Sequence, residues 1–258
     1  LGSRSGAVTV AIDVWHRDIE DFFEMQTENG DYRKKSFDIF PQIAVNDLFM
    51  QRVENDLSWT LVDPHEIRQK YDVELAETYG EEFEKIYMKI EEDDSLEFKK
   101  EISAKALFKK FLKTIVETGM PYVFFKDLVN ELNPNKHDGM IGNANLCVES
   151  YSNFSPTKLG NKKLDKNGNI TQEITPGKVH ACNLLSLNLA LFDDDKTLQE
   201  VTKLAVRILD NTIELKNPTI PKKKIKKDMK YLFHLFYNNQ IFLSTKSEQE
   251  GKLKIVSF

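Results

Sequence analysis

Cysteine is scarce in this chain, with Cys147 and Cys182 as its two thiols among 258 residues. So small a number excludes a disulfide-rich secreted scaffold and a zinc site built from four cysteines. The spacing of the pair does not say whether the two sulfurs meet, because disulfide geometry is set by the fold. In a cytosolic setting we expect two free thiols.

Long apolar runs are also missing, since no stretch approaches the roughly 18 residues of a membrane-spanning helix. The start of the chain lacks a basic segment followed by an apolar one. We therefore expect no secretory signal peptide and a cytoplasmic location. The first residue is Leu1 and the chain begins inside a motif, from which we expect a fragment of a longer protein.

A marked excess of either charge is absent as well. The formal net charge is −5 and the isoelectric point is about 5.7. These values give no global electrostatic reason for binding to nucleic acid or to a membrane. With 40% hydrophobic and 30% charged residues, the composition is typical of a globular protein with one large domain or two small ones.

Short apolar strands alternate with amphipathic helices along the first half of the chain. Strands are expected at 7–12, 37–45, 59–62 and 121–125, and helices at 18–23, 46–53, 74–92 and 104–117. This alternation predicts an α/β architecture. A polar loop at 133–143, a hairpin turn at 165–169 and a helix at 198–209 are expected to follow.

The acidic run Glu91-Glu92-Asp93-Asp94 is a candidate metal cluster. Adjacent carboxylates converge on a cation only where a fold aims them, so we interpret the run as a solvated helix end. We expect no metal site in this chain.

The most informative stretch is Asn145-Leu146-Cys147-Val148-Glu149. In an extended strand, alternate side chains point the same way, so the amide, the thiol and the carboxylate would share one face. A thiol between an amide and a carboxylate is suited to proton or hydrogen-atom chemistry. Taken alone the pattern has another interpretation, because a strand cysteine is commonly a small buried hydrophobe.

Further motifs accompany this stretch in a definite order. They are Gly2-Ser3-Arg4-Ser5-Gly6-Ala7, Trp15-His16, Asp63-Pro64-His65, Gly80-Glu81-Glu82-Phe83, Asn133-Pro134-Asn135-Lys136-His137, Cys182-Asn183-Leu184 and Ser186-Leu187-Asn188-Leu189. With these motifs, residues 1–220 resemble the catalytic (large, alpha) subunit of ribonucleotide reductase. We interpret residues 1–220 as a partial barrel domain and residues 221–258 as an unmatched basic and aromatic tail.

The resemblance implies part of a ten-stranded α/β barrel, with the radical cysteine at the tip of a central finger loop. Cys147 takes the place of the thiyl-radical cysteine that abstracts the 3′ hydrogen of a ribonucleotide. Glu149 matches the carboxylate that accepts the 3′-hydroxyl proton. Asn145 matches the amide that hydrogen-bonds the ribose hydroxyls, and Leu146 lies with these residues in the substrate site. Cys182 matches one member of the redox pair that reduces the 2′ position.

The resemblance also implies partners outside this chain. The second redox cysteine is expected N-terminal to Leu1. No cofactor is expected to be bound by the chain itself. A metal-containing small subunit, or cobalamin in class II enzymes, would supply the radical, and thioredoxin or glutaredoxin the electrons. We favour class I and a diphosphate substrate. The complete enzyme is expected to be an allosteric, ATP-binding homodimer that needs the remaining fragments of the large subunit.

Two alternatives stay open from the sequence. In the first, the chain is an inactive truncated product without catalytic function, as the unmatched tail suggests. In the second, the basic run 222–227 and the aromatic run 231–237 bind RNA or DNA.

Overall fold

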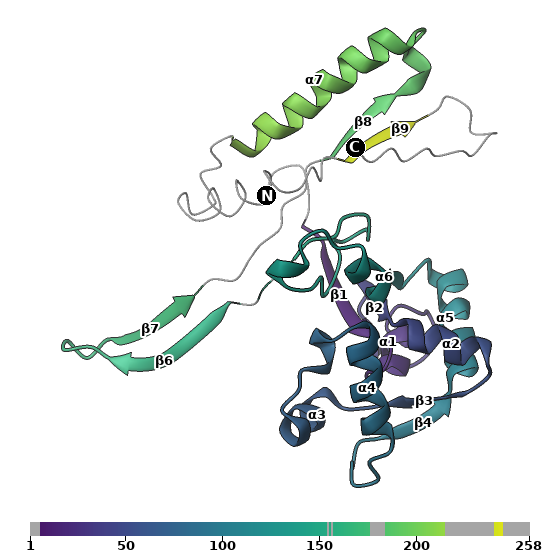
Figure 1. The fold of residues 1–258 in the computed structure, drawn as a ribbon, viewed down its shortest axis with the longest axis vertical. Coiled ribbons are helices and arrows are strands. Elements are labelled where there is room, and N and C mark those ends of the chain that lie inside the picture. The colour runs from purple at the N-terminus through teal and green to yellow at the C-terminus, as the bar shows by residue number, and fades with distance from the viewer. Residues whose placement is uncertain (1–5, 154, 156, 176–183, 215–239, 245–258) are drawn as a thin grey trace. The chain divides into compact units, whose positions relative to one another are not determined.

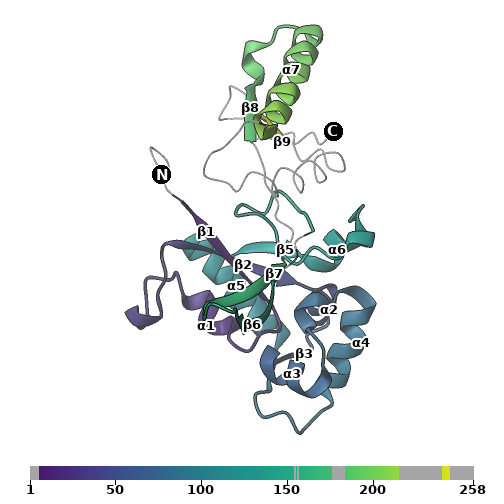
Figure 2. The same cartoon turned by 90° about the vertical axis from the view of Figure 1, so that its left-hand side faces the viewer.

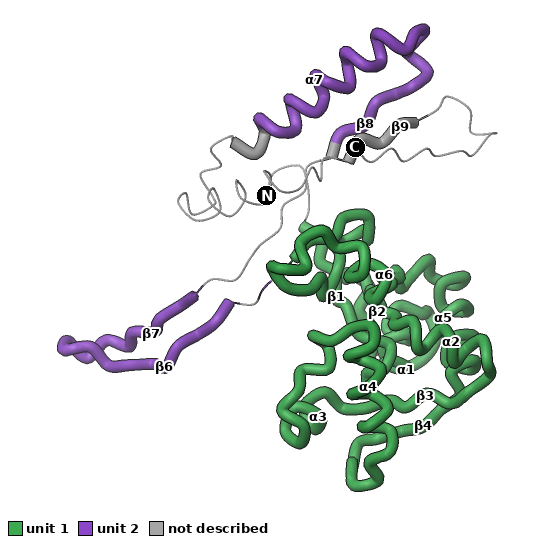
Figure 3. The backbone as a smooth tube through the Cα atoms, viewed as in Figure 1, with its two compact units in different colours: residues 1–153 green, residues 154–258 purple. Residues whose placement is uncertain are grey.

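The computed structural model describes residues 6–153, 155, 157–175, 184–214 and 240–244 (Figure 1). The chain divides into two compact units, Leu1–Asn153 and Phe154–Phe258 (Figure 3). Elements of the described residues are mixed α/β, which confirms the predicted class. Those residues contain no closed sheet, so the structure by itself does not establish a ten-stranded barrel.

The first unit is built on a parallel sheet of β1 (Val8–Asp13), β2 (Ile39–Val45) and β5 (Tyr122–Phe125), in the order β1-β2-β5 (Figure 2). β2 lies in the middle, and its last five residues are buried. A parallel strand covered on both faces is expected to be apolar along its length. The polar exception in β2 is Gln42, which is completely buried.

The connections between these strands supply the helices of the first unit. They are α1 (Ile19–Glu24), η1 (Tyr32–Lys34), α2 (Asp47–Glu54), α3 (Pro64–Tyr71), η2 (Leu75–Glu77), α4 (Gly80–Glu91) and α5 (Ala104–Thr118). β3 (Ser58–Leu61) and β4 (Lys100–Ser103) form a separate antiparallel pair. After β5 come α6 (Lys126–Glu131) and η3 (Lys136–Asp138).

Local signals explain where α5 begins and ends. The Ser103 hydroxyl accepts a hydrogen bond from the backbone N–H of Ala106 at 3.2 Å, which caps the first turn. Gly119 follows the last turn with a φ of 76°, a left-handed conformation that glycine adopts without steric cost. The predicted helix at 104–117 is confirmed.

The predicted helix at 74–92 was too long. Its first residues instead form the short η2 and an extended Tyr79, and α4 begins at Gly80. Gly80, the first residue of α4, has a φ of +56°, a left-handed conformation that separates the extended Tyr79 from the helical turns that follow. The apolar face of α4 then enters the core, where Tyr87 stacks on Trp59 and on Phe83 with ring centroids 4.5 and 5.2 Å apart.

The acidic run after α4 is engaged in ion pairs with basic side chains. Arg52 donates to both carboxylate oxygens of Glu91 at 2.5 Å. Asp93 pairs with Lys70 at 2.6 Å. Lys99 donates to the backbone carbonyls of Glu91 and Asp93, at 2.9 and 3.1 Å, and so satisfies acceptors at the end of the helix. Glu91 and Asp93 therefore tie helices together, whereas Glu92 and Asp94 are exposed, as expected for a solvated helix end.

The second unit contains the antiparallel hairpin of β6 (Lys158–Leu164) and β7 (Ile170–Thr175). Its turn is the predicted one at 165–169. The Asp165 carboxylate accepts from the N–H groups of Asn167 and Asn169, both at 2.8 Å, and Gly168 has a φ of 80°.

The rest of the second unit comprises β8 (Leu184–Asn188), η4 (Leu189–Leu191), α7 (Asp195–Glu214) and β9 (Gln240–Ser244), with β8 and β9 paired in parallel. The helix expected at 198–209 is present and longer at both ends. The boundary expected at residue 220 lies outside the described residues. No helix in the described part of the chain combines the length and apolar character needed to cross a membrane.

Candidate functional site

The cysteine stretch lies in a loop that packs against the sheet of the first unit. Ala144 and Tyr151 form an isolated antiparallel bridge that closes the loop at its base. The Tyr151 ring stacks on Phe124 of β5, with ring centroids 5.8 Å apart and 26° between the planes. Ala44 of β2 belongs to the same small core. The loop is thus fixed at its base, and residues 145–150 form its tip.

The stretch 145–149 is a turn and not the extended strand in which alternate side chains would share one face. The N–H of Val148 donates to the Asn145 carbonyl at 3.2 Å, and the N–H of Asn145 donates to the Ser150 carbonyl at 3.1 Å. Val148 has a φ of 62°, in the left-handed region. The alternation of faces that holds in a strand therefore does not hold here.

The side chain of Asn145 is the physical reason for the turn. Its Oδ1 accepts hydrogen bonds from the backbone N–H groups of Glu149 and Ser150, both at 3.0 Å. Asparagine competes in this way with strand pairing for backbone donors. The structure does bring Asn145, Cys147 and Glu149 together, but within one turn rather than along one strand face.

Cys147 is exposed at the tip of this turn. Partial desolvation raises the pKa of its thiol, and the nearby carboxylate of Glu149 raises that pKa further. A nucleophilic cysteine needs the opposite setting, in which a positive group or a helix N-terminus stabilises the thiolate. Both effects act against ionisation of the Cys147 thiol.

Tyr151 and Gln42 were not recognised from the sequence as part of the site. The Tyr151 hydroxyl donates to the Val148 carbonyl at 2.9 Å. Burial raises the pKa of Tyr151, and Glu149 adds to the rise. Gln42 donates from Nε2 to the Asn145 carbonyl at 2.6 Å and to the Leu146 carbonyl at 3.3 Å. The signal that could have identified Gln42 is its position as a lone amide within the apolar run 39–45.

A buried polar cluster occupies the carboxyl ends of the parallel strands, where α/β sheets commonly bind ligands. The Lys126 ammonium group donates to Asp13 at 2.9 Å and to the Ala76 carbonyl at 2.5 Å. Burial raises the pKa of Asp13, and the attraction of Lys126 opposes that rise.

Asp127 completes this cluster. Its carboxylate accepts from the Asn46 amide at 3.0 Å and from the backbone N–H groups of Asp47 and Gly80 at 2.7 and 2.9 Å. Lys126 and Asp127 are thus bonded to groups of the protein itself, and the cluster is a brace that connects the start of α6 to β1, α2 and α4.

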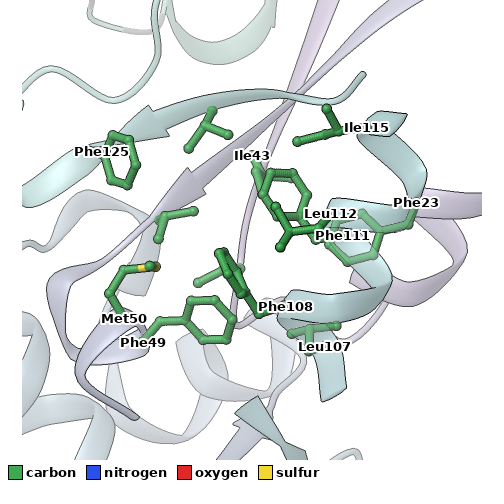
Figure 4. A pocket seen from close by; sticks show the side chains of 13 residues that line it. Phe23, Ile43, Phe49, Met50, Leu107, Phe108, Phe111, Leu112, Ile115 and Phe125 are labelled. Carbon is green, nitrogen blue, oxygen red and sulfur yellow. The ribbon is translucent and has the colours of Figure 1, made fainter. Parts of the chain in front are cut away.

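The face of the sheet opposite the cysteine loop contains an apolar cavity of about 240 Å³ (Figure 4). Phe23, Ile43, Phe49, Phe111 and Phe125 are among its lining side chains, which come from α1, β2, α2, α5 and β5. The lining carries no polar side chain that could act as an acid, a base or a ligand. Of these features, the cysteine loop is the one that carries groups suited to acid, base or hydrogen-atom chemistry.

Of the predicted site residues, Cys182 lies outside the described residues. Among the described residues, no group of three or more His, Cys, Asp or Glu side chains is arranged to hold a metal ion.

Comparison with known proteins gives a consistent result. The family model described as ribonucleotide reductase, barrel domain, matches residues 1–231. The "Ribonucleoside-diphosphate reductase subunit alpha" of a Synechocystis species is 50% identical over 220 residues, which cover 84% of this chain and 26% of that protein. The protein of the same name from Treponema pallidum is 42% identical over 228 residues, 86% of this chain and 27% of its own.

A eukaryotic relative extends the comparison. The "Ribonucleoside-diphosphate reductase large subunit" of Plasmodium falciparum is 36% identical over 220 residues, which cover 83% of this chain and 24% of that protein. The chain thus spans about a quarter of the length of these curated relatives.

Proposed function

The chain belongs to the ribonucleotide reductase family, whose barrel domain it matches over most of its length, and we propose on this premise that it forms the cysteine-bearing part of a reductase large subunit. The reaction would convert ribonucleoside diphosphates to deoxyribonucleoside diphosphates. The observation that carries the proposal is the turn at 145–149, in which Asn145 organises the backbone and an exposed Cys147 thiol lies within two residues of the Glu149 carboxylate.

In the proposed reaction, Cys147 acts as a sulfur radical that takes the 3′ hydrogen of the ribose and becomes a thiol. Glu149 accepts the proton of the 3′ hydroxyl. Loss of the 2′ hydroxyl as water is then coupled to oxidation of two other thiols to a disulfide, which supplies two electrons. Return of the 3′ hydrogen from Cys147 restores the sulfur radical, so the reaction balances with one water and one disulfide formed.

The turn suggests which atom of Asn145 would bind the substrate. Its Oδ1 already accepts from two backbone N–H groups. The amide Nδ2 is the group left to donate to the ribose hydroxyls, with Leu146 lining the same site. Cys182 is proposed as one thiol of the redox pair, with its partner outside this chain.

The complete assembly belongs to the proposal as well. β1, β2 and β5 would be three parallel strands of a ten-stranded barrel, and the loop that carries Cys147 would be its central finger. A class I partner, the metal-containing small subunit, would supply the radical; in class II cobalamin would do so. Thioredoxin or glutaredoxin would reduce the disulfide, and the large subunit would be an allosteric, ATP-binding homodimer.

The test is turnover in a large subunit that contains this chain together with its missing segments and the small subunit. Cys147→Ser is expected to abolish formation of deoxyribonucleoside diphosphate, because serine cannot form the sulfur radical. The matched control is Ser58→Ala, a mild change at an exposed position of β3, which should leave turnover unchanged. Retention of turnover by Cys147→Ser would refute the proposal.

The alternative of an inactive product draws on one observation. Among the described residues, β1 and β5 each have a strand neighbour on one side only, and such open edges favour aggregation. Cooperative unfolding of the chain in urea would count against this alternative. A broad transition with dye binding to exposed apolar surface would support it.

A further inference from the structure

The turn that presents Cys147 contains a backbone conformation that its own sequence disfavours. Val148 has a φ of 62°, and a β-branched residue is seldom found in the left-handed region. Such conformations persist where the surrounding contacts over-determine them, and they are concentrated at functional sites. The contacts that hold this turn therefore indicate what sets the position of the thiol.

Some of these contacts are internal to the loop. Asn145 accepts from Glu149 and Ser150, and Tyr151 donates to the carbonyl of Val148. Contacts of this kind keep the shape of the turn. The bonds of Asn145 do not fix the place of the turn relative to the sheet, because donor and acceptor move together, whereas Tyr151 connects the turn to β5 only through its stacking on Phe124.

Gln42 supplies a contact of the other kind. It lies on β2, in register with Ala11 of β1 and Tyr122 of β5, so it is held between two neighbouring strands. Its Nε2 donates at 2.6 and 3.3 Å to the carbonyls of Asn145 and Leu146, the two residues that precede Cys147. The central strand of the sheet is therefore hydrogen-bonded to the backbone of the two residues that precede Cys147.

The other half of this amide points to a positioning role. Oε1 of Gln42 is buried and has no hydrogen-bond partner among the described residues. A buried acceptor without a partner is unfavourable, and an apolar side chain of similar length would avoid that cost. The interactions that account for an amide at this position are therefore those of its donor group, which holds the two carbonyls ahead of Cys147.

We infer that Gln42 is a positioning residue for Cys147: its amide fixes the two carbonyls ahead of the cysteine and thereby orients the thiol relative to Glu149. The geometry stands on the contacts above. The consequence for turnover rests on the proposed function.

The first experiment needs no turnover. The chain carrying Cys182→Ser leaves Cys147 as its single thiol, and its alkylation by iodoacetamide is followed as a function of pH. Gln42→Met keeps the length of the side chain and removes the donor. The pH profile of alkylation should then shift to lower pH, because a released turn no longer holds the partly desolvated Cys147 beside Glu149. Urea unfolding of the same variant should remain a single cooperative transition, which shows that the fold is retained, with a midpoint lowered by the loss of the two hydrogen bonds.

Two further variants make this result decisive. Gln42→Asn is one methylene too short to reach the turn and should shift the profile in the same direction. Thr60→Val, a buried polar-to-apolar change on β3, should leave the profile unchanged. If both Gln42 variants superimpose on the parent profile, the inference is overturned.

The second experiment measures turnover in the complete enzyme. Gln42→Met should lower kcat by roughly 10- to 100-fold, the effect of a small misplacement of a reacting group, and leave KM within about twofold of the parent value. An unchanged kcat would refute the role in turnover. Failure of the proposed function is recognised separately, because Cys147→Ser would then retain activity while the alkylation result still tests Gln42.

Discussion

Replacing Asn145 is expected to separate the shape of the turn from its chemistry. Asn145→Ala removes the acceptor for two backbone N–H groups, those of Glu149 and Ser150, each bonded at 3.0 Å. A typical hydrogen bond contributes about 1 kcal/mol, and a buried donor left unpaired costs about 1–3 kcal/mol. Since Ser150 is buried and Glu149 partly exposed, we expect a loss of about 2–3 kcal/mol.

Asn145→Asp provides the matched comparison. A carboxylate keeps both acceptor interactions, and hydrogen bonds to a charged acceptor are stronger than those to a neutral one. Repulsion from Glu149 offsets part of that gain, so the stability should stay within about 1 kcal/mol of the parent. The Nδ2 donor is lost in both variants, and turnover should therefore fall in both.

The assay is urea unfolding of the chain, followed by tryptophan fluorescence from Trp15 and Trp59, with turnover measured in the complete enzyme. In a thermal scan of the same variants, a loss of about 2–3 kcal/mol corresponds to a fall in Tm of roughly 4–12 °C for a unit of this size. An Asn145→Ala midpoint equal to that of the parent would refute the structural role of the side chain. Full turnover by Asn145→Asp would refute the role of Nδ2.

Three further predictions concern charges in the first unit. Glu149→Gln should lower the thiol pKa of the cysteine, measured by alkylation against pH, and reduce turnover roughly 10²–10⁴-fold through loss of the base; an unmoved thiol profile would contradict it. Arg52→Ala should lower the free energy of unfolding in urea by about 3 kcal/mol, because Glu91 keeps a largely buried charge without its partner. The double change Arg52→Met with Glu91→Leu removes both charges and should be nearly neutral. Equal losses of unfolding free energy in the single and the double variant would contradict this account. Burial and Asp93 raise the pKa of Tyr71 to about 12. The stability that the neutral Tyr71 hydroxyl contributes is therefore complete below pH ~10 and is lost as the pH rises through ~12. The ionisation of tyrosine is followed by ultraviolet absorbance, and a titration between these two pH values that is the same in Tyr71→Phe as in the parent would contradict the raised pKa.

The direction of the thiol shift separates two kinds of cysteine chemistry. Nucleophilic cysteines have a lowered pKa, because a positive neighbour stabilises the thiolate. At Cys147, burial and the negative charge of Glu149 act in the opposite direction. This electrostatic setting agrees with hydrogen-atom transfer from an S–H group and argues against a thiolate nucleophile.

Much of the local structure follows from the sequence itself. The apolar runs at 37–45 and 121–125 predict β2 and β5, and the turn residues at 165–169 predict the β6–β7 hairpin. These features depend on interactions between residues that are close in the chain, so a local pattern is sufficient to indicate them. The motifs around Cys147 likewise identify the family without a structure.

Short elements stabilised by distant contacts were not predicted. α3, β4 and α6 have 8, 4 and 6 residues. Segments of that length have little stability of their own and are selected by what they pack against. β4, for example, is a strand because it pairs with β3 across about 40 residues of chain.

The shape of the cysteine turn was decided by the tertiary structure. Residues 145–149 alternate in polarity and are compatible with a strand, yet Asn145, Tyr151 and Gln42 together hold a left-handed Val148. Gln42 is 103 residues away from Asn145 in the sequence, and no local pattern announces that contact. The sequence by itself determined which groups are available for the chemistry. The packing of a loop on a buried strand decided how they face one another, because a hydrogen bond across that distance exists only once the sheet has formed.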